Sequence, residues 1–166
     1  MPQEFSAGIV AFRGAENPKF LLLKYPKGYW GFSRGNIEPG EDSRTAAIRE
    51  LKEETNLEPV KVFEGFKEIV GLFYRKECKK TPTATTPTQP ATGEKALAAS
   101  DKPEFVIVHK DITFYLAEVN DEEVKLTEHP EFGWFSFEEA MNKLQFKNDK
   151  ELLKKVEEFL ANYLKK

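Results

Sequence analysis

The sequence predicts an α/β (α+β) fold, in which a mixed β-sheet carries helices on its faces as an α/β/α sandwich. Two observations support this class: extended runs rich in β-branched and aromatic residues flank a helix-forming segment, and the C-terminal segment is amphipathic with helical spacing. A third is that 40% of the 166 residues are hydrophobic, 14 of them Phe, which is enough for one core. We therefore expect residues 1–166 to form a single domain.

The first elements form a predicted hairpin and a loop. Residues 4–13 and 19–25 have strand composition and are joined by a turn at 14–18. Residues 26–42 are rich in Gly and Pro and predict a long irregular loop. Long ordered loops are usually functional, so this loop is expected to matter for activity.

Residues 43–55 predict a helix. Asp42 or Ser43 can cap its start, and Asn56 tolerates the left-handed conformation that closes many helices. The helical period places Ile48, Leu51 and Thr55 on the side toward the core. The same period groups Glu50, Glu53 and Glu54 on another side.

Two long extended runs follow, at 59–76 and 104–119, and the first is expected to break near Gly65. Between them, residues 77–103 are dominated by Thr, Pro, Ala and Lys, so we expect a flexible insertion in a hairpin. Three elements complete the chain: a strand at 133–137, a helix at 138–145 with Ser136 and Glu139 at capping-box spacing, and an amphipathic helix at 149–166.

Composition limits the partners. The net charge is −3 and the pI about 5.6, which disfavours a large nucleic-acid duplex but allows a small polyphosphate ligand beside a bound metal. Cys78 is the single cysteine, which fits a reducing compartment. We see no signal peptide and no apolar run long enough to span a membrane. We expect a cytoplasmic monomer with no membrane partner.

The three glutamates pose a choice between a solvated helix face and a metal site. Like charges at positions i, i+3 and i+4 repel, and a bound cation would neutralise them. Carboxylate oxygens suit Mg²⁺ or Mn²⁺. The Gly-rich loop can add a backbone carbonyl, which we assign to Arg34, and Arg49 is spaced to pair with Glu41 or Glu53.

Residues 35–57 read GNIEPGEDSRTAAIRELKEETNL, which resembles the signature of the Nudix hydrolase family, G-x5-E-x7-R-E-U-x-E-E-x-G-U with U aliphatic. Every fixed position matches except the last Gly, where Asn56 stands. Ser33 and Arg34 occupy positions where many relatives have Pro-Lys, and Asn36 replaces a His of one subgroup. The resemblance implies a Nudix sandwich and metal-dependent hydrolysis, with Glu50, Glu53 and Glu54 as metal ligands.

Further stretches are similar to the asymmetrical diadenosine tetraphosphate hydrolases: FEGFKE at 63–68, and the segments from ITFYLAEV through LTEHPEFGWFSFEEA to LQFK at 112–147. This resemblance implies cleavage of diadenosine tetraphosphate to ATP and AMP with Mg²⁺. It adds an acidic contact to the metal from Glu128. It also adds four contacts to the nucleotide, from Tyr74, Phe146, Lys67 and Lys110. The alternative for each of these residues is a plain surface or core role. His109 and His129 receive no catalytic role.

In the expected mechanism, Glu53 or Glu54 takes the proton of a metal-bound water, and the sequence does not choose between them. Arg49 holds the ligands in place. One alternative function is removal of pyrophosphate from nucleoside triphosphates or RNA 5′ ends, which uses the same metal chemistry. Another is a non-catalytic Nudix module that senses a nucleotide, although such modules typically lack part of the glutamate cluster.

Overall fold

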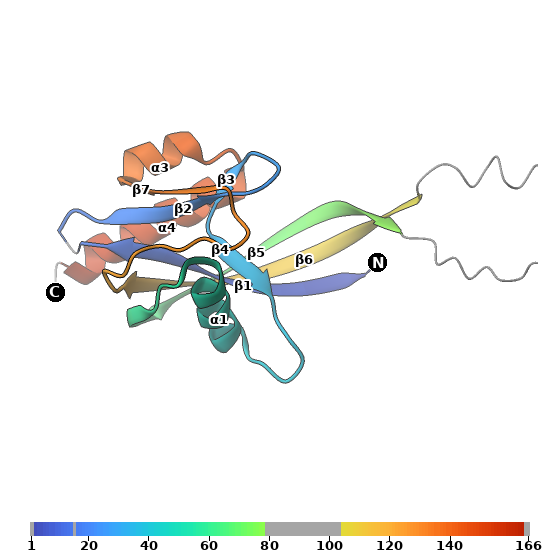
Figure 1. Ribbon diagram of the computed structural model, residues 1–166, viewed down its shortest axis with the longest axis horizontal. Helices are drawn as coiled ribbons and strands as arrows, with labels where there is room; N and C mark the ends of the chain where they lie inside the picture. Colours follow the sequence, from blue (N-terminus) through green and yellow to red (C-terminus); the bar gives the residue numbers. More distant parts are fainter. Residues whose placement is uncertain (1, 15, 79–103, 165–166) are drawn as a thin grey trace, which may run out of the picture. The chain divides into compact units, whose positions relative to one another are not determined.

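The computed structural model describes residues 2–14, 16–78 and 104–164, so most of the predicted insertion, residues 79–103, lies outside the described residues. The described elements follow one another along the chain as shown in Figure 1. They are β1 (Gln3–Arg13), β2 (Lys19–Lys24), β3 (Trp30–Gly31), β4 (Ser33–Asn36), α1 (Ser43–Thr55), β5 (Pro59–Cys78), β6 (Glu104–Val119), β7 (Glu131–Phe135), α3 (Phe137–Lys143) and α4 (Lys147–Leu164).

The strands form one seven-stranded sheet in the order β3-β2-β1-β6-β5, with β4 added on β1 and β7 on β2. β1 and β2 pair antiparallel with Phe12 opposite Phe20, as the predicted hairpin requires. β4 pairs antiparallel with the other half of β1, so that Ala7 faces Gly35 and Ile9 faces Ser33. The mixed sheet with helices confirms the predicted fold class.

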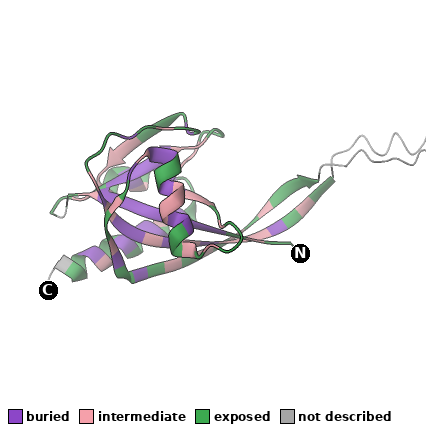
Figure 2. Cartoon of the chain, turned by 60° about the horizontal axis from the view of Figure 1, so that its bottom comes forward, coloured by how far each residue is buried: buried purple, intermediate pink, exposed green. Residues whose placement is uncertain are grey.

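One face of the sheet packs against α1. Side chains that alternate along β1 and β2 meet the apolar side of the helix, and Figure 2 shows these buried residues along the helix and the strands next to it. The cluster comprises Ala7, Ile9, Ala11, Leu21, Leu23, Ala46, Ala47, Leu51, Leu57, Ala117, Val119 and Val124. Leu51 and Thr55 are fully buried and Ile48 packs at the edge of the cluster, as the helical period predicted.

The opposite face carries α4. The Phe12 ring lies 5.7 Å from that of Phe63, and Phe63 contacts Phe159 of α4 edge to face with centroids 6.1 Å apart. Leu152, Leu153, Val156 and Leu160 of α4 are buried with them. Helices therefore cover both faces, which is the predicted sandwich.

Two local predictions were wrong. Residues 26–42 are not irregular throughout, because β3 and β4 form within them by pairing with β2 and β1. Residues 59–76 do not break near Gly65, since β5 runs continuously to Cys78. A Cβ on Gly65 would lie 3.2 Å from the Phe159 ring, so this glycine allows the close approach of α4.

The chain divides into two compact units. One comprises residues 5–71 and 111–166 and contains the cluster and helices above. The other comprises residues 1–4 and 72–110, of which the structure describes 2–4, 72–78 and 104–110. No helix in the described residues is long and apolar enough to cross a membrane. The assignment of residues 1–166 to a single domain stays a prediction.

Candidate active site

Helix α1 is fixed at both ends by its own sequence. The Asp42 side chain caps the start by accepting a hydrogen bond of 2.7 Å from the backbone N–H of Thr45. Asn56 closes the helix with φ of 69°, and its N–H donates to the carbonyl of Lys52. Both caps confirm the sequence prediction, and they set the positions of the residues between them.

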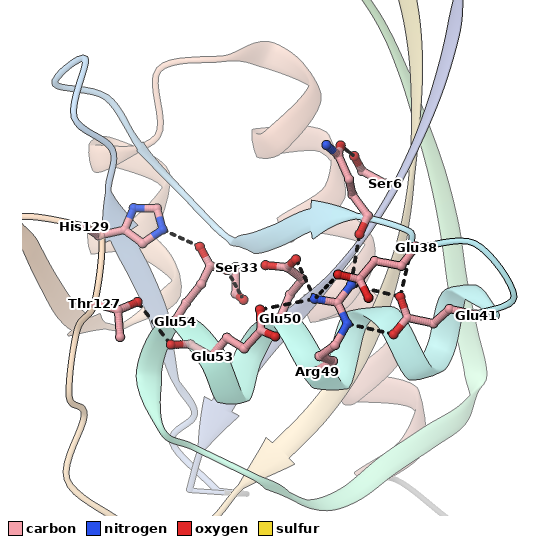
Figure 3. Close-up of polar contacts among 11 residues, drawn as sticks. Ser6, Ser33, Glu38, Glu41, Arg49, Glu50, Glu53, Glu54, Thr127 and His129 are labelled. Atoms are coloured by element: carbon pink, nitrogen blue, oxygen red, sulfur yellow. Dashed lines mark hydrogen bonds and ion pairs between the residues drawn. The ribbon is translucent and has the colours of Figure 1, made fainter.

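Arg49, in the middle of α1, lies among a group of carboxylates along the helix and just before it (Figure 3). Its Nε and Nη2 donate to the two oxygens of Glu41 at 2.7 and 2.9 Å, a bidentate pair. Its Nη1 donates to Glu50 at 3.0 Å and to Glu53 at 3.2 Å. The guanidinium beside Glu41 lowers the pKa of that carboxyl to about 2. Both predicted partners of Arg49, Glu41 and Glu53, are confirmed, and Glu50 is a third.

The Glu50 carboxylate lies directly against Gly35 of β4. A Cβ on Gly35 would be 2.0 Å from the carboxyl carbon of Glu50, so the absence of a side chain makes room for this carboxylate. Burial raises the pKa of Glu50, the hydrogen bond from Arg49 lowers it, and the charge of Glu54 raises it again. Glu50 is therefore a partly desolvated carboxylate with like charge next to it.

Glu54 is buried, although the helical period grouped it with the polar residues. The Ser33 hydroxyl donates to its Oε1 at 2.9 Å. Its Oε2 forms a hydrogen bond with Nε2 of His129, from the loop between β6 and β7. Each oxygen of this carboxylate thus has a partner of its own, and both partners come from other parts of the chain.

Glu53 has a different environment. Its side chain is 58% exposed, and its carboxylate accepts the hydrogen bond from Arg49. Its backbone carbonyl accepts a hydrogen bond of 3.1 Å from the Thr127 hydroxyl, which ties the end of α1 to the same loop that carries His129.

Strand β4 and helix α1 face each other through alternate residues of the strand. Ser33 contacts Glu54 and Gly35 receives Glu50, so the strand and helix run in opposite directions. Two residues of a strand span about 6.8 Å, and four residues of a helix about 6.0 Å. The two spacings match closely enough for both contacts to form at once.

A row of aromatic rings begins at His129. Tyr25 meets His129 edge to face with centroids 4.5 Å apart, Tyr29 stacks on Tyr25 at 4.8 Å, and Phe146 meets Tyr29 edge to face at 5.1 Å. The Arg34 guanidinium lies 5.2 Å from the Tyr25 ring centroid and donates to the Tyr29 hydroxyl. Phe146, which was predicted to bind substrate, is therefore linked to Glu54 by a row of contacts and remains 48% exposed.

For the other predicted site residues, the structure gives a location but no contact with the carboxylate cluster among the described residues. Glu128 is exposed in the loop next to His129, and Lys67 is exposed on β5. Tyr74 and Lys110 lie in the second unit, where the Tyr74 hydroxyl bonds to Glu4 and the Lys110 ammonium lies 5.7 Å from the Tyr74 ring centroid. Their roles at a nucleotide stay predictions.

The carboxylates fit a hard divalent cation by their chemistry. Glu50, Glu53 and Glu54 offer oxygen ligands, and burial, followed by the charge of Glu54, raises the pKa of Glu50. Among the described residues, no group of three or more His, Cys, Asp or Glu side chains already converges on one metal position. The metal roles of these glutamates, of Glu128 and of the Arg34 carbonyl stay predictions.

Comparison with known proteins decides the family. The sequence pattern that defines the NUDIX domain matches residues 2–156. The chain belongs to the NUDIX family. It is a NUDIX hydrolase, and such enzymes generally need a divalent metal. The predicted family is confirmed.

Similar proteins match this NUDIX chain over nearly its whole length. It is 32% identical to the asymmetrical bis(5′-nucleosyl)-tetraphosphatase of Caenorhabditis elegans over 95% of this chain and 97% of that protein. The corresponding enzyme of Mus musculus is 29% identical, with 95% of each chain covered. The crystal structure of a C. elegans Ap4A hydrolase binary complex superimposes with a TM-score of 0.66 at 31% identity, covering 96% of this chain and 98% of that one.

Sequence reasoning missed two residues of the site. His129 was given no role because it lacks a neighbour at metal-ligand spacing, and its partner Glu54 is 75 residues away. Ser33 was noted as a departure from the family pattern without a function. The available signal was that Ser33 precedes the signature Gly35 by two residues, which places both on one face of a strand.

Proposed function

We propose that this NUDIX hydrolase splits diadenosine tetraphosphate into ATP and AMP in a Mg²⁺- or Mn²⁺-dependent reaction. The observation that carries the proposal is the likeness to asymmetrical tetraphosphatases along the whole chain, not at the signature alone. The carboxylates around α1 and the aromatic row that ends at Phe146 are consistent with a ligand that has both a phosphate chain and a base.

Glu50, Glu53 and Glu54 would hold the ion. A bound divalent cation supplies positive charge to the phosphate oxygens and lowers the pKa of a bound water. Glu53 or Glu54 takes the proton of the attacking water, whose oxygen bonds to phosphorus while the anhydride P–O bond to the leaving phosphate breaks. Arg49 keeps Glu41, Glu50 and Glu53 in place throughout.

The ends of the substrate would be bound by aromatic and basic side chains. Phe146 has an exposed ring on which adenine can stack. Tyr74, Lys67 and Lys110 complete the proposed contacts with the base and phosphates, and Glu128 adds an acidic contact to the metal. We also propose that the protein works as a cytoplasmic monomer.

The test is product analysis. Purified protein is incubated with Mg²⁺ and either diadenosine tetraphosphate or ATP, and the products are separated by anion-exchange chromatography. ATP and AMP in equal amounts from the dinucleotide, with ATP alone left intact, would support the proposal.

Two other outcomes would contradict it. Release of pyrophosphate from ATP, with the dinucleotide untouched, would indicate a triphosphate pyrophosphohydrolase, and RNA with a 5′ triphosphate would be tested next. Nucleotide binding without turnover of either compound would indicate a sensing module.

A further inference from the structure

The buried carboxylate of Glu54 is held by two side chains that the catalytic scheme above does not use. Ser33 donates to Oε1, and His129 contacts Oε2. Ser33 is 2% exposed and His129 is 8% exposed, so these hydrogen bonds lie away from bulk water. A buried carboxylate that lost one of these partners would lose a hydrogen bond that sets its orientation.

The direction of the hydrogen bonds follows from the chemistry of the groups. A carboxylate in its ionised form only accepts, and in that form Nε2 of His129 is the donor to Glu54. In a neutral ring, Nδ1 then carries a lone pair. Nδ1 is buried and has no hydrogen-bond partner among the described residues, which fits a ring whose polar function is directed entirely at Glu54.

The His129 ring is itself fixed in place. Tyr25 packs against it edge to face, and the Tyr25 hydroxyl donates to the carbonyl of Phe32, the residue before Ser33. Burial raises the pKa of Tyr25, so that its hydroxyl stays a donor. The two donors to Glu54 therefore belong to one connected group of side chains.

We propose that Ser33 and His129 are positioning residues that orient the Glu54 carboxylate for metal binding. With one hydrogen bond on each oxygen, the plane of the carboxylate is set before the ion arrives, and a free lone pair on each oxygen remains available. Glu53 is exposed, and among the described residues its carboxylate accepts a hydrogen bond only from Arg49. Glu54 is thus the preset ligand of the cluster, and Glu53 is the one that adjusts.

This inference rests on the metal role proposed for Glu54, but not on the identity of the nucleotide. It is tested by titrating Mn²⁺ into the purified protein without nucleotide and following free Mn²⁺ by its paramagnetic resonance signal. Loss of a residue that orients a metal ligand typically weakens metal affinity about 10- to 100-fold. We expect that loss for Ser33→Ala, and also for His129→Phe, which keeps a ring but removes the donor.

Two matched variants separate positioning from general damage. His129→Gln keeps an N–H donor and is expected to bind Mn²⁺ within about threefold of the wild type. Ser6→Ala removes another buried serine hydroxyl, on the neighbouring strand β1, which donates to Asn36 at 3.0 Å and forms no hydrogen bond with a carboxylate in the described part of the chain. It is expected to leave Mn²⁺ affinity unchanged. Thermal unfolding shows which temperature keeps every variant folded during the titration.

Mn²⁺ affinity equal to that of the wild type in both Ser33→Ala and His129→Phe would overturn the inference. So would equal losses in Ser33→Ala and Ser6→Ala, or a wild type that binds no Mn²⁺. If Mn²⁺ binding follows the expected order but diadenosine tetraphosphate is not cleaved, the substrate assignment fails while the positioning of Glu54 stands.

Discussion

Gly35→Ala is expected to inactivate the enzyme without unfolding it. The added Cβ would lie 2.0 Å from the carboxyl carbon of Glu50 and 2.3 Å from each of its oxygens. Ordinary contact begins at 3.4 Å. The Glu50 carboxylate must therefore move by about 1.4 Å, the difference between these two distances. Because the carboxylate ends a flexible side chain, it can move while the backbone of β4 stays in place.

The size of the effect follows from that displacement. Misplacing a catalytic group by about 1 Å costs about 100-fold in rate, so kcat should fall by at least this factor. Stability should not fall with it. Gly35 lies in a strand and its φ is not positive, and replacing such a glycine by Ala removes a backbone entropy cost of about 0.5–1 kcal/mol.

The assay compares kcat with the free energy of unfolding in urea for Gly35→Ala and for Gly8→Ala. Gly8 lies on β1 opposite Arg34, and its added Cβ would be 2.4 Å from the backbone oxygen of Ser33. Backbone cannot move as cheaply, so Gly8→Ala should lower the free energy of unfolding more than Gly35→Ala does. Near-normal kcat in Gly35→Ala, or a stability loss as large as that of Gly8→Ala, would refute the reasoning.

Three further predictions concern helix α1 and Glu41, which lies just before it. The pKa of Glu41 is about 2 in the folded protein against an ordinary value of 4.5. Its contribution to stability is therefore complete above pH 4.5 and lost as the pH falls toward 2. The difference in unfolding free energy between wild type and Glu41→Gln should shrink over that range in urea titrations, and a constant difference would contradict it. Leu51→Ala removes a fully buried side chain and should cost about 2–5 kcal/mol of unfolding free energy, measured in urea. Replacing the general base by Gln should lower kcat about 10²- to 10⁴-fold in steady-state assays of Glu53→Gln and Glu54→Gln; near-normal kcat would exclude that glutamate as the base.

The sequence predicted α1 well because its signals are local. Asp42 and Asn56 adjoin the helix ends, and Leu51 lies on the side that the period of 3.6 residues assigns to the core. Strand β4 was missed because its partners on β1 lie 24 to 30 residues earlier in the chain, and β3 because it is only 2 residues long. Gly65 was interpreted as a break, whereas its lack of a side chain admits a ring from α4.

The sequence also predicted the carboxylate cluster, but it did not predict that Glu54 is buried while Glu53 is exposed. Periodicity alone treats Glu53 and Glu54 as neighbours on a polar face. The loop that carries His129 contacts the end of α1 and buries Glu54. The residues next to Glu54 in the sequence do not predict this contact. Which glutamate is exposed is therefore a tertiary property.

The matched spacing of β4 and α1 has a consequence for how this enzyme tolerates insertions and deletions. Residues 37–41 connect two elements whose alignment is set elsewhere, so a change of length there should alter the connection and Glu41 while Ser33 and Gly35 keep their partners. A single deletion inside β4 is different. Deleting Arg34 would put Ser33 and Gly35 on opposite faces of the strand, so that either Glu50 or Glu54 loses its partner on β4. Natural selection should therefore tolerate changes in the length of the loop after β4 more readily than insertions or deletions within its 4 residues.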